Sequence, residues 1–311
     1  MKTDAIVLNN IGGGFDILVH RLPNKNETVM MRGMLMSEDL AKGGNVAVAL
    51  SRLGMHTAII GKIGTDEAGE RDFGWLKEAG VDTSELIQDS AVMTGQGIGL
   101  IADNGENIMI TGESSSKHLT YEEVNAAIER LTPAGYFIGG FEVRSELVMP
   151  AMKLAKARGI TTVLNPSPIP DEGLEKNLNY IDYFFVNEVE ARLLLGMEPG
   201  SPTDSRWLCE QLKKEYGAVN VVVTLGGDGA VCLYDGNYCE FPSIKVKAID
   251  ASGAGDGFLS ACVFGLSKGK SLQEACEWAN WYAAYSVTKK DCLPGYASAE
   301  AIDQFRKGYQ S

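Results

Sequence analysis

Histidine is scarce in this chain of 311 residues, which has only His20, His56 and His118, and no two of them show H-x-x-x-H spacing. A metal centre built from histidines is therefore not expected. The six cysteines form no C-x-x-C pair, and five of them fall in stretches that predict helix or strand. They are predicted to be buried free thiols rather than zinc ligands or disulfides.

Basic residues are also few. The chain has 28 Lys and Arg residues against 41 Asp and Glu residues, a formal net charge of -13, and no run of Lys or Arg. A surface with this balance repels a phosphate backbone, so we expect no nucleic-acid partner.

Long apolar runs are missing too, since no stretch approaches the ~18 uninterrupted apolar residues of a membrane-spanning helix. The first residues, MKTDAIVLNNIGGG, have one lysine and a short apolar run, without the small-residue cleavage site of a signal peptide. These absences predict a cytoplasmic protein with no membrane partner.

Short apolar runs, by contrast, are present and alternate regularly with segments whose apolar residues recur at the spacing of a helix. The runs are dense in β-branched and aromatic residues and predict strands buried on both faces, as in a parallel sheet covered by helices. They lie at residues 136–140, 160–165, 182–187 and 219–226, and AIVLNNIGGG at residues 5–14 predicts an earlier βα unit. We therefore expect an α/β fold with a central, mostly parallel sheet flanked by helices.

Two segments depart from this alternation, at residues 16–40 and 92–112. The second alternates around Asn104-Gly105, and Asn-Gly supplies the positive φ angles of a tight hairpin turn. Together the segments are predicted to form a small antiparallel β-sheet lid inserted in the large α/β domain. Because the chain shows no internal repeat or low-complexity linker, residues 1–311 are interpreted as a single domain.

The segment DASGAGDGF, at residues 250–258, follows a strand-like run and opens a long apolar helix. Small residues at Gly253, Ala254 and Gly255 let backbone N–H groups approach an anion closely, and the helix dipole adds positive potential there. Asp256 falls in the first helical turn beside that anion, where phosphoryl transfer needs a base. Alternatively, Asp256 only caps the helix and the glycines only turn the chain.

DASGAGDGF resembles the D-T-x-G-A-G-D-x-F signature of the ribokinase family, also called the phosphofructokinase-B type carbohydrate kinases. Similar family markers occur in order along the chain, with LPNKNETV at residues 22–29, GKIGTDEAGE at 61–70 and VLNPSPIP at 163–170. The resemblance implies a ribokinase-like fold and an ATP-dependent phosphotransferase that uses Mg²⁺. It also implies that Asp256 is the catalytic base and that the amides from Gly253 to Gly255 form the anion hole.

On the nucleotide side, VNEVEARLLLG places Asn187 and Glu190 on the family's N-x-x-E motif, whose glutamate organises Mg²⁺ and the phosphates, largely through water. Taken alone, the pair also fits a helix N-cap and its capping-box partner. TLGGDG resembles the family's T-L-G-x-x-G, which approaches the nucleotide. The further ATP-binding residues implied by the resemblance are Thr224, Gly226, Gly229 and Asn280.

On the sugar side, the resemblance implies that Asp16 and Glu142 bind sugar hydroxyls, because a carboxylate accepts hydrogen bonds from two neighbouring hydroxyls at once. Lys42, Gly43 and Asn45 fall on the family's Gly-Gly-Lys-Gly-Ala-Asn, and complete the implied substrate site.

Three departures concentrate at that site. Leu40 and Ala41 stand where the family has two glycines on which the sugar packs, and Gly14 stands where an asparagine contacts a hydroxyl. The identity of the sugar is therefore left open.

The loop for a monovalent cation such as K⁺ departs as well. Asp250 and Ser252 keep the family's positions, whereas Asp291-Cys292 replaces the usual Gly-Ala. The resemblance allows a monovalent cation at Asp250 and Ser252 without requiring one.

We therefore expect an ATP-dependent kinase that transfers the γ-phosphate to a hydroxymethyl group of a sugar. A nucleoside, a ketose or a sugar acid are alternative acceptors, and a catalytically silent sugar-binding protein is an alternative of another class. A dinucleotide-binding dehydrogenase is disfavoured because Ile17 stands where the third glycine of G-x-G-x-x-G would be. The family pattern also implies a homodimer joined through the lid, whose edge strands would otherwise be exposed.

Overall fold

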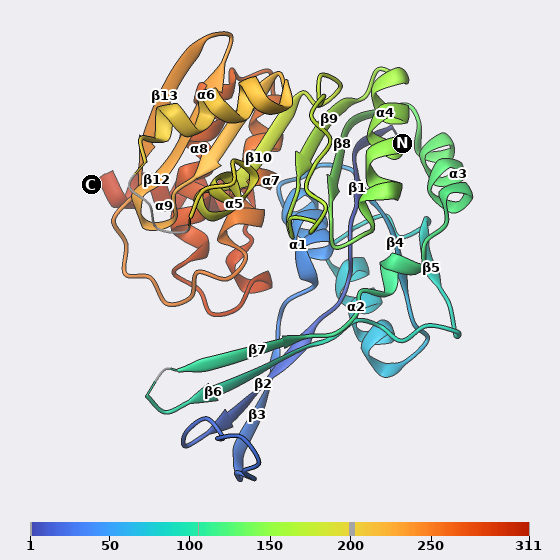
Figure 1. Cartoon of the computed structure of the whole chain (residues 1–311), viewed down its shortest axis with the longest axis vertical. Helices are drawn as coiled ribbons and strands as arrows, with labels where there is room; N and C mark the ends of the chain where they lie inside the picture. The colour runs from blue at the N-terminus through green and yellow to red at the C-terminus, as the bar shows by residue number, and fades with distance from the viewer. Residues whose placement is uncertain (1, 105, 199–202, 311) are drawn as a thin grey trace.

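The computed structural model describes residues 2–104, 106–198 and 203–310. Within them nine strands form one sheet in the order β13-β12-β11-β10-β9-β8-β1-β4-β5 (Figure 1). The strands are β1 (Thr3–Leu8), β4 (Thr57–Ile63), β5 (Leu86–Gln88), β8 (Ala134–Gly140), β9 (Thr161–Asn165), β10 (Tyr183–Asn187), β11 (Asn220–Thr224), β12 (Gly229–Tyr234) and β13 (Asn237–Pro242).

The strands from β11 through β5 run parallel, and β12 and β13 extend the sheet antiparallel at one edge. The central strand β1 shows how the sequence produces this layering. Ala5 and Val7 are buried in the core on one face of the sheet, and Ile6 and Leu8 in the core on the other. The predicted mostly parallel sheet, buried on both faces, is confirmed.

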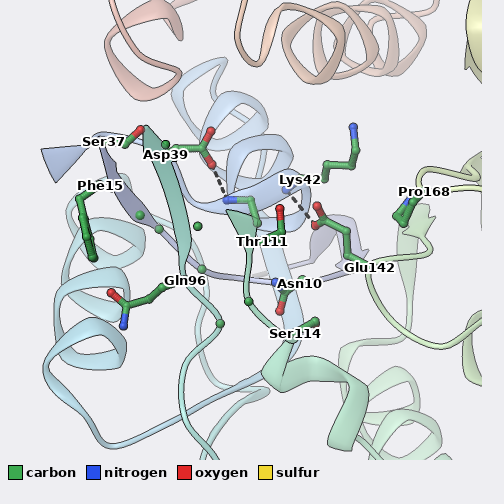
Figure 2. Close-up of a pocket in the computed structure, with 18 of the residues that line it drawn as sticks. Asn10, Phe15, Ser37, Asp39, Lys42, Gln96, Thr111, Ser114, Glu142 and Pro168 are labelled. Carbon is green, nitrogen blue, oxygen red and sulfur yellow. Dashed lines mark hydrogen bonds between the residues drawn. The ribbon is translucent and has the colours of Figure 1, made fainter. Parts of the chain in front are cut away.

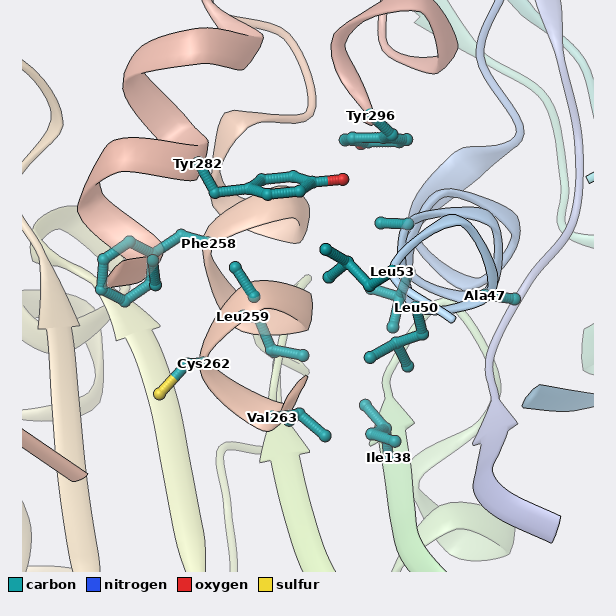
Figure 3. Close-up of a cluster of buried hydrophobic side chains, with 14 of the residues drawn as sticks. Ala47, Leu50, Leu53, Ile138, Phe258, Leu259, Cys262, Val263, Tyr282 and Tyr296 are labelled. Carbon is teal, nitrogen blue, oxygen red and sulfur yellow. The ribbon is translucent and has the colours of Figure 1, made fainter. Parts of the chain in front are cut away.

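Helices cover both faces of the sheet. One core contains residues of α1 (Ala41–Arg52), α2 (Glu67–Glu78), α7 (Ala254–Ser267), α8 (Leu272–Ser286) and α9 (Ala299–Gln310), and the other contains residues of α3 (Tyr121–Leu131), α4 (Ser145–Ala157), α5 (Glu188–Leu194) and α6 (Ser205–Tyr216). In the first core, Leu50 of α1 and Leu53, which caps that helix, face Leu259 of α7, with Tyr282 of α8 beside them (Figure 3). This packing fixes α1 against α7, the two helices that carry the site described below.

A second, four-stranded sheet projects from the α/β body (Figure 1). Its order is β3-β2-β6-β7, from β2 (Gly14–Val19), β3 (Met31–Ser37), β6 (Gly97–Ala102) and β7 (Asn107–Thr111). The antiparallel pair of β6 and β7 confirms the predicted hairpin, although Gly105 of its turn lies outside the described residues. The expectation of an entirely antiparallel sheet is wrong, because β2 and β6 both leave the body in the same direction and pair in parallel.

The predicted βα unit at residues 5–14 is also wrong in its second half, since β1 continues into β2 rather than into a helix. The glycines that suggested a helix-opening turn serve a different purpose. A Cβ atom on Gly12 or Gly14 would overlap the carbonyl oxygen of Gly95 or Gly97. Glycine is therefore required because the segments leading into β2 and β6 approach each other too closely for side chains.

All six cysteines are free, five of them buried and Cys239 partly buried, which confirms the prediction of free thiols. Among the helices of the described residues, none combines the length and the apolar character needed to cross a membrane.

Candidate active site

Two cavities meet at Lys42, at the carboxyl ends of the parallel strands, where open α/β sheets bind ligands. The first, here called the lid-side pocket, has a volume of about 570 Å³, and the predicted residues that line it are Asp16, Lys42 and Glu142. Figure 2 shows Lys42 and Glu142 in this pocket. The second, here called the glycine groove, has a volume of about 530 Å³, and the predicted residues that line it are Lys42, Asn187, Thr224, Gly226, Gly229, Gly253, Ala254, Gly255, Asp256 and Asn280.

The start of α7 explains its glycine-rich sequence. Gly253 is the N-cap and adopts a left-handed conformation with φ 67°, which disfavours any residue with a side chain. A Cβ atom there would lie 2.7 Å from the Sγ atom of Cys292 and would overlap the hydroxyl of Tyr296. That hydroxyl donates a hydrogen bond of 3.1 Å to the carbonyl oxygen of Gly253, which fixes the turn. The residues that open α7, Gly253 to Gly255, consequently line the glycine groove from a fixed position.

Asp256 lies in the first turn of α7 and is 9% exposed. The Nζ atom of Lys42 lies 3.8 Å from its Oδ1 atom, and Asn45 Nδ2 donates a hydrogen bond of 3.3 Å to its Oδ2 atom. Burial raises the pKa of Asp256, against the opposing effects of the Lys42 charge and the Asn45 hydrogen bond. Asp256 in turn is the main cause of the raised pKa of Lys42. The pair therefore places a base of increased strength at the junction of the two cavities.

Asp39 supports this arrangement, although no sequence pattern singled it out. Its Oδ1 atom accepts hydrogen bonds from the Ala41 amide at 2.6 Å and from Asn45 Nδ2 at 3.5 Å. Its Oδ2 atom accepts a hydrogen bond of 2.8 Å from the Cys292 thiol, whose pKa is raised by burial and by this carboxylate. Asp39 thus orients Asn45, which contacts Asp256. An aspartate two residues before the start of a helix predicts a turn in which its carboxylate accepts a hydrogen bond from a nearby backbone amide. It does not predict the contacts with Asn45 and Cys292.

The two family glycines that are replaced here behave differently from the expectation. Leu40 does not line the lid-side pocket, because its side chain is fully buried. Ala41 does line the pocket, and it keeps the conformation of a glycine, with φ 53°. Only one of the two replacements therefore changes the surface available to a ligand.

Glu142 lies beside the backbone of Lys42 in the lid-side pocket (Figure 2), and its Oε2 atom accepts a hydrogen bond of 3.0 Å from the backbone amide of Lys42. Burial raises the pKa of Glu142 to about 8, against the effect of the Lys42 charge, and Asp256 adds to the increase. Glu142 is therefore mostly protonated near neutral pH, and can donate as well as accept a hydrogen bond.

This pKa predicts how the free energy of unfolding of the unliganded protein depends on pH. Because the pKa of Glu142 is higher in the folded chain than in the unfolded one, the folded chain binds more protons between the two values, and stability falls as the pH rises towards about 8. We expect Glu142→Gln to be more stable than the native chain at pH 8 by about 1–2 kcal/mol. The difference should disappear below about pH 4.5.

Urea unfolding between pH 4 and pH 9 measures this difference. Glu78→Gln, at an exposed position near the end of α2, is the matched control and should show no such trend. A stability difference for Glu142→Gln that does not change with pH would contradict the assignment.

The remaining nucleotide-side positions lie around the glycine groove, except Glu190. Asn187 and Glu190 form a capping box at the start of α5, in which Glu190 Oε2 accepts a hydrogen bond of 2.9 Å from the Asn187 amide. Glu190 is buried behind the groove. Gly226 and Gly229 have φ angles of 56° and 106°, so both turns that border the groove need glycine.

Asn280 and Gly43, which was predicted to belong to the substrate site, are held by backbone contacts. Asn280 lines the groove from α8 and donates a hydrogen bond of 2.6 Å from its Nδ2 atom to the carbonyl oxygen of Pro242. Gly43 lines neither cavity, because it packs against the end of β1, where a Cβ atom would lie 2.8 Å from the carbonyl carbon of Asn9. Gly43 therefore positions α1.

The predicted cation residues lie beside the groove but line neither cavity. The carboxylate of Asp250 accepts hydrogen bonds of 2.9 Å from the Ser252 amide and of 3.0 Å from the Asp291 amide. Asp291 adopts φ 62°, which explains why the family has glycine there. In the part of the chain that the structure describes, no three acidic, histidine or cysteine side chains form a group able to hold a metal ion.

Comparison with known proteins places the chain in a family. The pfkB family of carbohydrate kinases matches residues 41–298. The chain is 30% identical over 293 residues to a ribokinase of Haemophilus influenzae, covering 93% of this chain and 94% of the other. It is 28% identical over 308 residues to a ribokinase of Staphylococcus aureus, covering 98% and 100%.

The fold has solved counterparts as well. The structure of Arabidopsis thaliana ribokinase complexed with ribose and ATP superposes with a TM-score of 0.85 at 22% identity and covers 99% of both chains. The ribokinase-like fold expected from the sequence is therefore confirmed. The family match spans most of the chain, including α1, with Lys42, and α7, with Asp256. The chain belongs to the pfkB family of carbohydrate kinases.

Proposed function

We propose that Asp256 is the general base in a transfer of the γ-phosphate of ATP to a hydroxymethyl group of a sugar. The observation that carries the proposal is that Lys42 lines both the lid-side pocket and the glycine groove, and that its Nζ atom lies 3.8 Å from Asp256, which lines the groove. A sugar in the first cavity and ATP in the second would bring an acceptor oxygen and a phosphoryl group to the same carboxylate.

In this reaction the carboxylate of Asp256 removes the proton of the sugar hydroxyl as its oxygen attacks the γ-phosphorus. The bond between the γ-phosphorus and the bridging oxygen breaks, and ADP leaves with that oxygen. The raised pKa of Asp256 makes it a stronger base than an exposed aspartate, and Lys42 keeps it ionised while also facing the transferred group. Proton removal and charge stabilisation thus come from one ion pair.

The glycine groove suits a nucleotide polyphosphate. A Cβ atom on Gly226, Gly227 or Gly255 would meet no atom within 4 Å, so these glycines leave open space along the groove for a ligand to approach the backbone. Of the amides from Gly253 to Gly255, at the start of α7, those of Gly253 and Gly255 would supply N–H donors for the transferred phosphoryl group, while the Ala254 amide donates a hydrogen bond of 3.3 Å to the Ala251 carbonyl oxygen.

A magnesium ion would bind with ATP and neutralise negative charge on its phosphates. The residues available to hold it are Asn187 on the groove wall and the buried carboxylate of Glu190 behind it, acting through water. An oxygen-rich set of this kind suits Mg²⁺, which keeps several of its own waters.

The four-stranded sheet is proposed to be the lid, built from residues 16–40 and 92–112 on a single domain of residues 1–311. Its β2 strand carries Asp16, whose pKa is raised by burial and by the nearby Asp291. Closure over the lid-side pocket would exclude water and prevent hydrolysis of ATP.

A monovalent cation such as K⁺ is proposed to bind at Asp250 and Ser252, where the Asp291 carboxylate adds negative charge. We further propose that the protein is cytoplasmic, a location that its six free thiols support.

The lid is also proposed to join two copies of the chain. Met30, Met31, Met34 and Met36 on and beside the edge strand β3 are between 48% and 83% exposed, a large apolar surface for a single copy. We expect sedimentation to give the mass of a dimer at micromolar concentration, and Met34→Lys to give the mass of a monomer. Met93→Lys, at an exposed methionine outside β3, is the control. A monomeric native chain would contradict the proposal.

A phosphorylation screen tests the function as a whole. Release of ADP is measured with MgATP and each of a set of pentoses, hexoses, sugar acids and nucleosides, in KCl and in choline chloride at equal ionic strength. We expect sugar-dependent release of ADP, faster in KCl. If ATP is bound but no acceptor supports turnover, the protein is a silent sugar-binding member of the family instead.

A further inference from the structure

Two polar side chains in the lid-side pocket have no hydrogen-bond partner. Asn10 and Ser114 are each 7% exposed and line the pocket. The Asn10 Oδ1 atom and the Ser114 Oγ atom are buried without a partner. A buried polar atom without a partner destabilises the folded chain, so unpaired groups of this kind inside a cavity indicate that a ligand completes them. In Figure 2 both residues lie on the side of the pocket away from the ammonium group of Lys42.

Asn10 follows the carboxyl end of β1 and is held rigidly by its backbone. Its amide donates a hydrogen bond of 2.9 Å to Asn9 Oδ1, and its carbonyl oxygen accepts a hydrogen bond of 3.3 Å from the Gly44 amide. Both backbone groups are thus used in fixing the residue. The side-chain amide, which offers both donors and an acceptor, remains free for a ligand.

Ser114 belongs to a run of three serines with different tasks. Ser115 Oγ donates to the Lys62 carbonyl oxygen at 2.7 Å, and Ser116 Oγ accepts a hydrogen bond of 3.1 Å from the Lys62 amide, so both fasten this loop to β4. Ser114 precedes the short helix η1 (Ser115–His118), where serine usually caps, but its side chain makes no capping bond. Of these three serines, Ser114 is therefore the one whose hydroxyl makes no hydrogen bond within the described structure.

We propose that Asn10 and Ser114 form a subsite that determines specificity by binding a hydroxyl group of the sugar at the end opposite the phosphorylated carbon. The inference rests on the proposed kinase function and adds the class of acceptor. The preferred acceptor is a neutral sugar with a hydroxyl at that end, and an analogue that lacks this hydroxyl leaves both side chains unpaired and is bound less well.

Charge around the subsite favours a neutral ligand over a sugar acid. Asp16 and Asp39 line the same pocket. Of the lysines there, Lys42 is paired with Asp256, and Lys117 is exposed. An anionic substituent placed beside two uncharged buried groups would therefore lose its hydration without a buried cation to replace it.

Matched sugars test the subsite in the native chain. D-fructose, 1-deoxy-D-fructose and 2-keto-D-gluconate differ only in carrying CH₂OH, CH₃ or a carboxylate at carbon 1, and D-ribofuranose and 1,4-anhydro-D-ribitol differ only in the hydroxyl at carbon 1. We expect kcat/KM for D-fructose or D-ribose to exceed that of its deoxy analogue by about 10-fold, and 2-keto-D-gluconate to be a poorer substrate than D-fructose. Equal values within a pair, or a preference for the acid, would overturn the proposal.

Variants then assign the preference to these side chains. In Asn10→Ala and Ser114→Ala we expect the KM for the better sugar to rise about 10-fold while kcat and the KM for ATP stay within about 2-fold, because the lost contact is made equally in the ground and transition states. The preference over the deoxy sugar should shrink accordingly. Ser116→Ala is the matched control, which should lower the unfolding temperature without changing that preference.

The outcomes separate the two proposals. Unchanged sugar KM values in both variants would overturn the subsite and leave the kinase function standing. Phosphorylation of nucleosides but of neither D-fructose nor D-ribose would also overturn it, since a base would then occupy this end. No phosphorylation of any acceptor would instead remove the proposed function on which the subsite rests.

Discussion

Asp256→Asn is expected to lower kcat by about 1,000-fold, which is within the range that a positioned general base contributes. Asparagine has nearly the same shape and still accepts the hydrogen bond from Asn45, but it cannot take the proton of the acceptor hydroxyl. The KM for ATP should change little, because Asp256 removes a proton rather than holding the nucleotide. The measurement is steady-state release of ADP with the best acceptor of the screen, beside thermal unfolding.

The pH profile adds a second readout. In the native chain burial raises the pKa of Asp256, so activity should decline on the acid side at a higher pH than an exposed aspartate would produce. The residual activity of Asp256→Asn should lack that decline. Stability should not fall greatly, because the raised pKa of Asp256 indicates that burial destabilises its carboxylate by more than Lys42 and Asn45 stabilise it. Full turnover by Asp256→Asn with a folded chain would eliminate Asp256 as the base.

The sequence predicted the parts of this protein that depend on local pattern. DASGAGDGF contains both the positive-φ glycine and the aspartate of the first turn, and each follows from what a tight strand-to-helix turn requires. The parallel strands could be predicted equally well, because a strand that is buried on both faces has a continuous apolar sequence.

Asp39, Asn10 and Ser114 were not predicted, because their roles depend on partners distant in the chain. Asp39 contacts Cys292, which is 253 residues away, and nothing local to either residue indicates the pair. Ser114 differs from Ser115 and Ser116 only in what the fold brings near it. A loop serine therefore has no sequence signal that separates a structural hydroxyl from a ligand-binding one.

Leu40 is a residue for which the family pattern led to a wrong expectation, again because its role depends on a contact that the sequence pattern does not show. By comparison with the family glycine, it was expected to enlarge the surface under the sugar, yet the side chain is fully buried. The reason lies one turn along α1, where the family has alanine and this chain has Gly44. A Cβ atom on Gly44 would overlap the Cβ atom of Leu40, so the two departures compensate each other.

This compensation predicts a large loss of stability for Gly44→Ala. The new methyl group is attached directly to the backbone and cannot rotate away, so we expect the free energy of unfolding to fall by about 3 kcal/mol, near the upper end of what overpacking costs. Because α1 also carries Lys42 and Asn45, the displacement should weaken the contacts with Asp256 and lower kcat as well. Urea unfolding and steady-state assays measure the two effects.

Two double variants identify the clash. Leu40→Gly/Gly44→Ala restores the family pattern and removes the overlapping Cβ atom, so its loss of stability should be smaller than the sum of the two single losses by about 2 kcal/mol. Leu40→Ala/Gly44→Ala keeps a Cβ atom at residue 40 and should show no such rescue. If both double variants behave alike, the overlap between residues 40 and 44 does not explain why this chain has lost the family's glycine and alanine together.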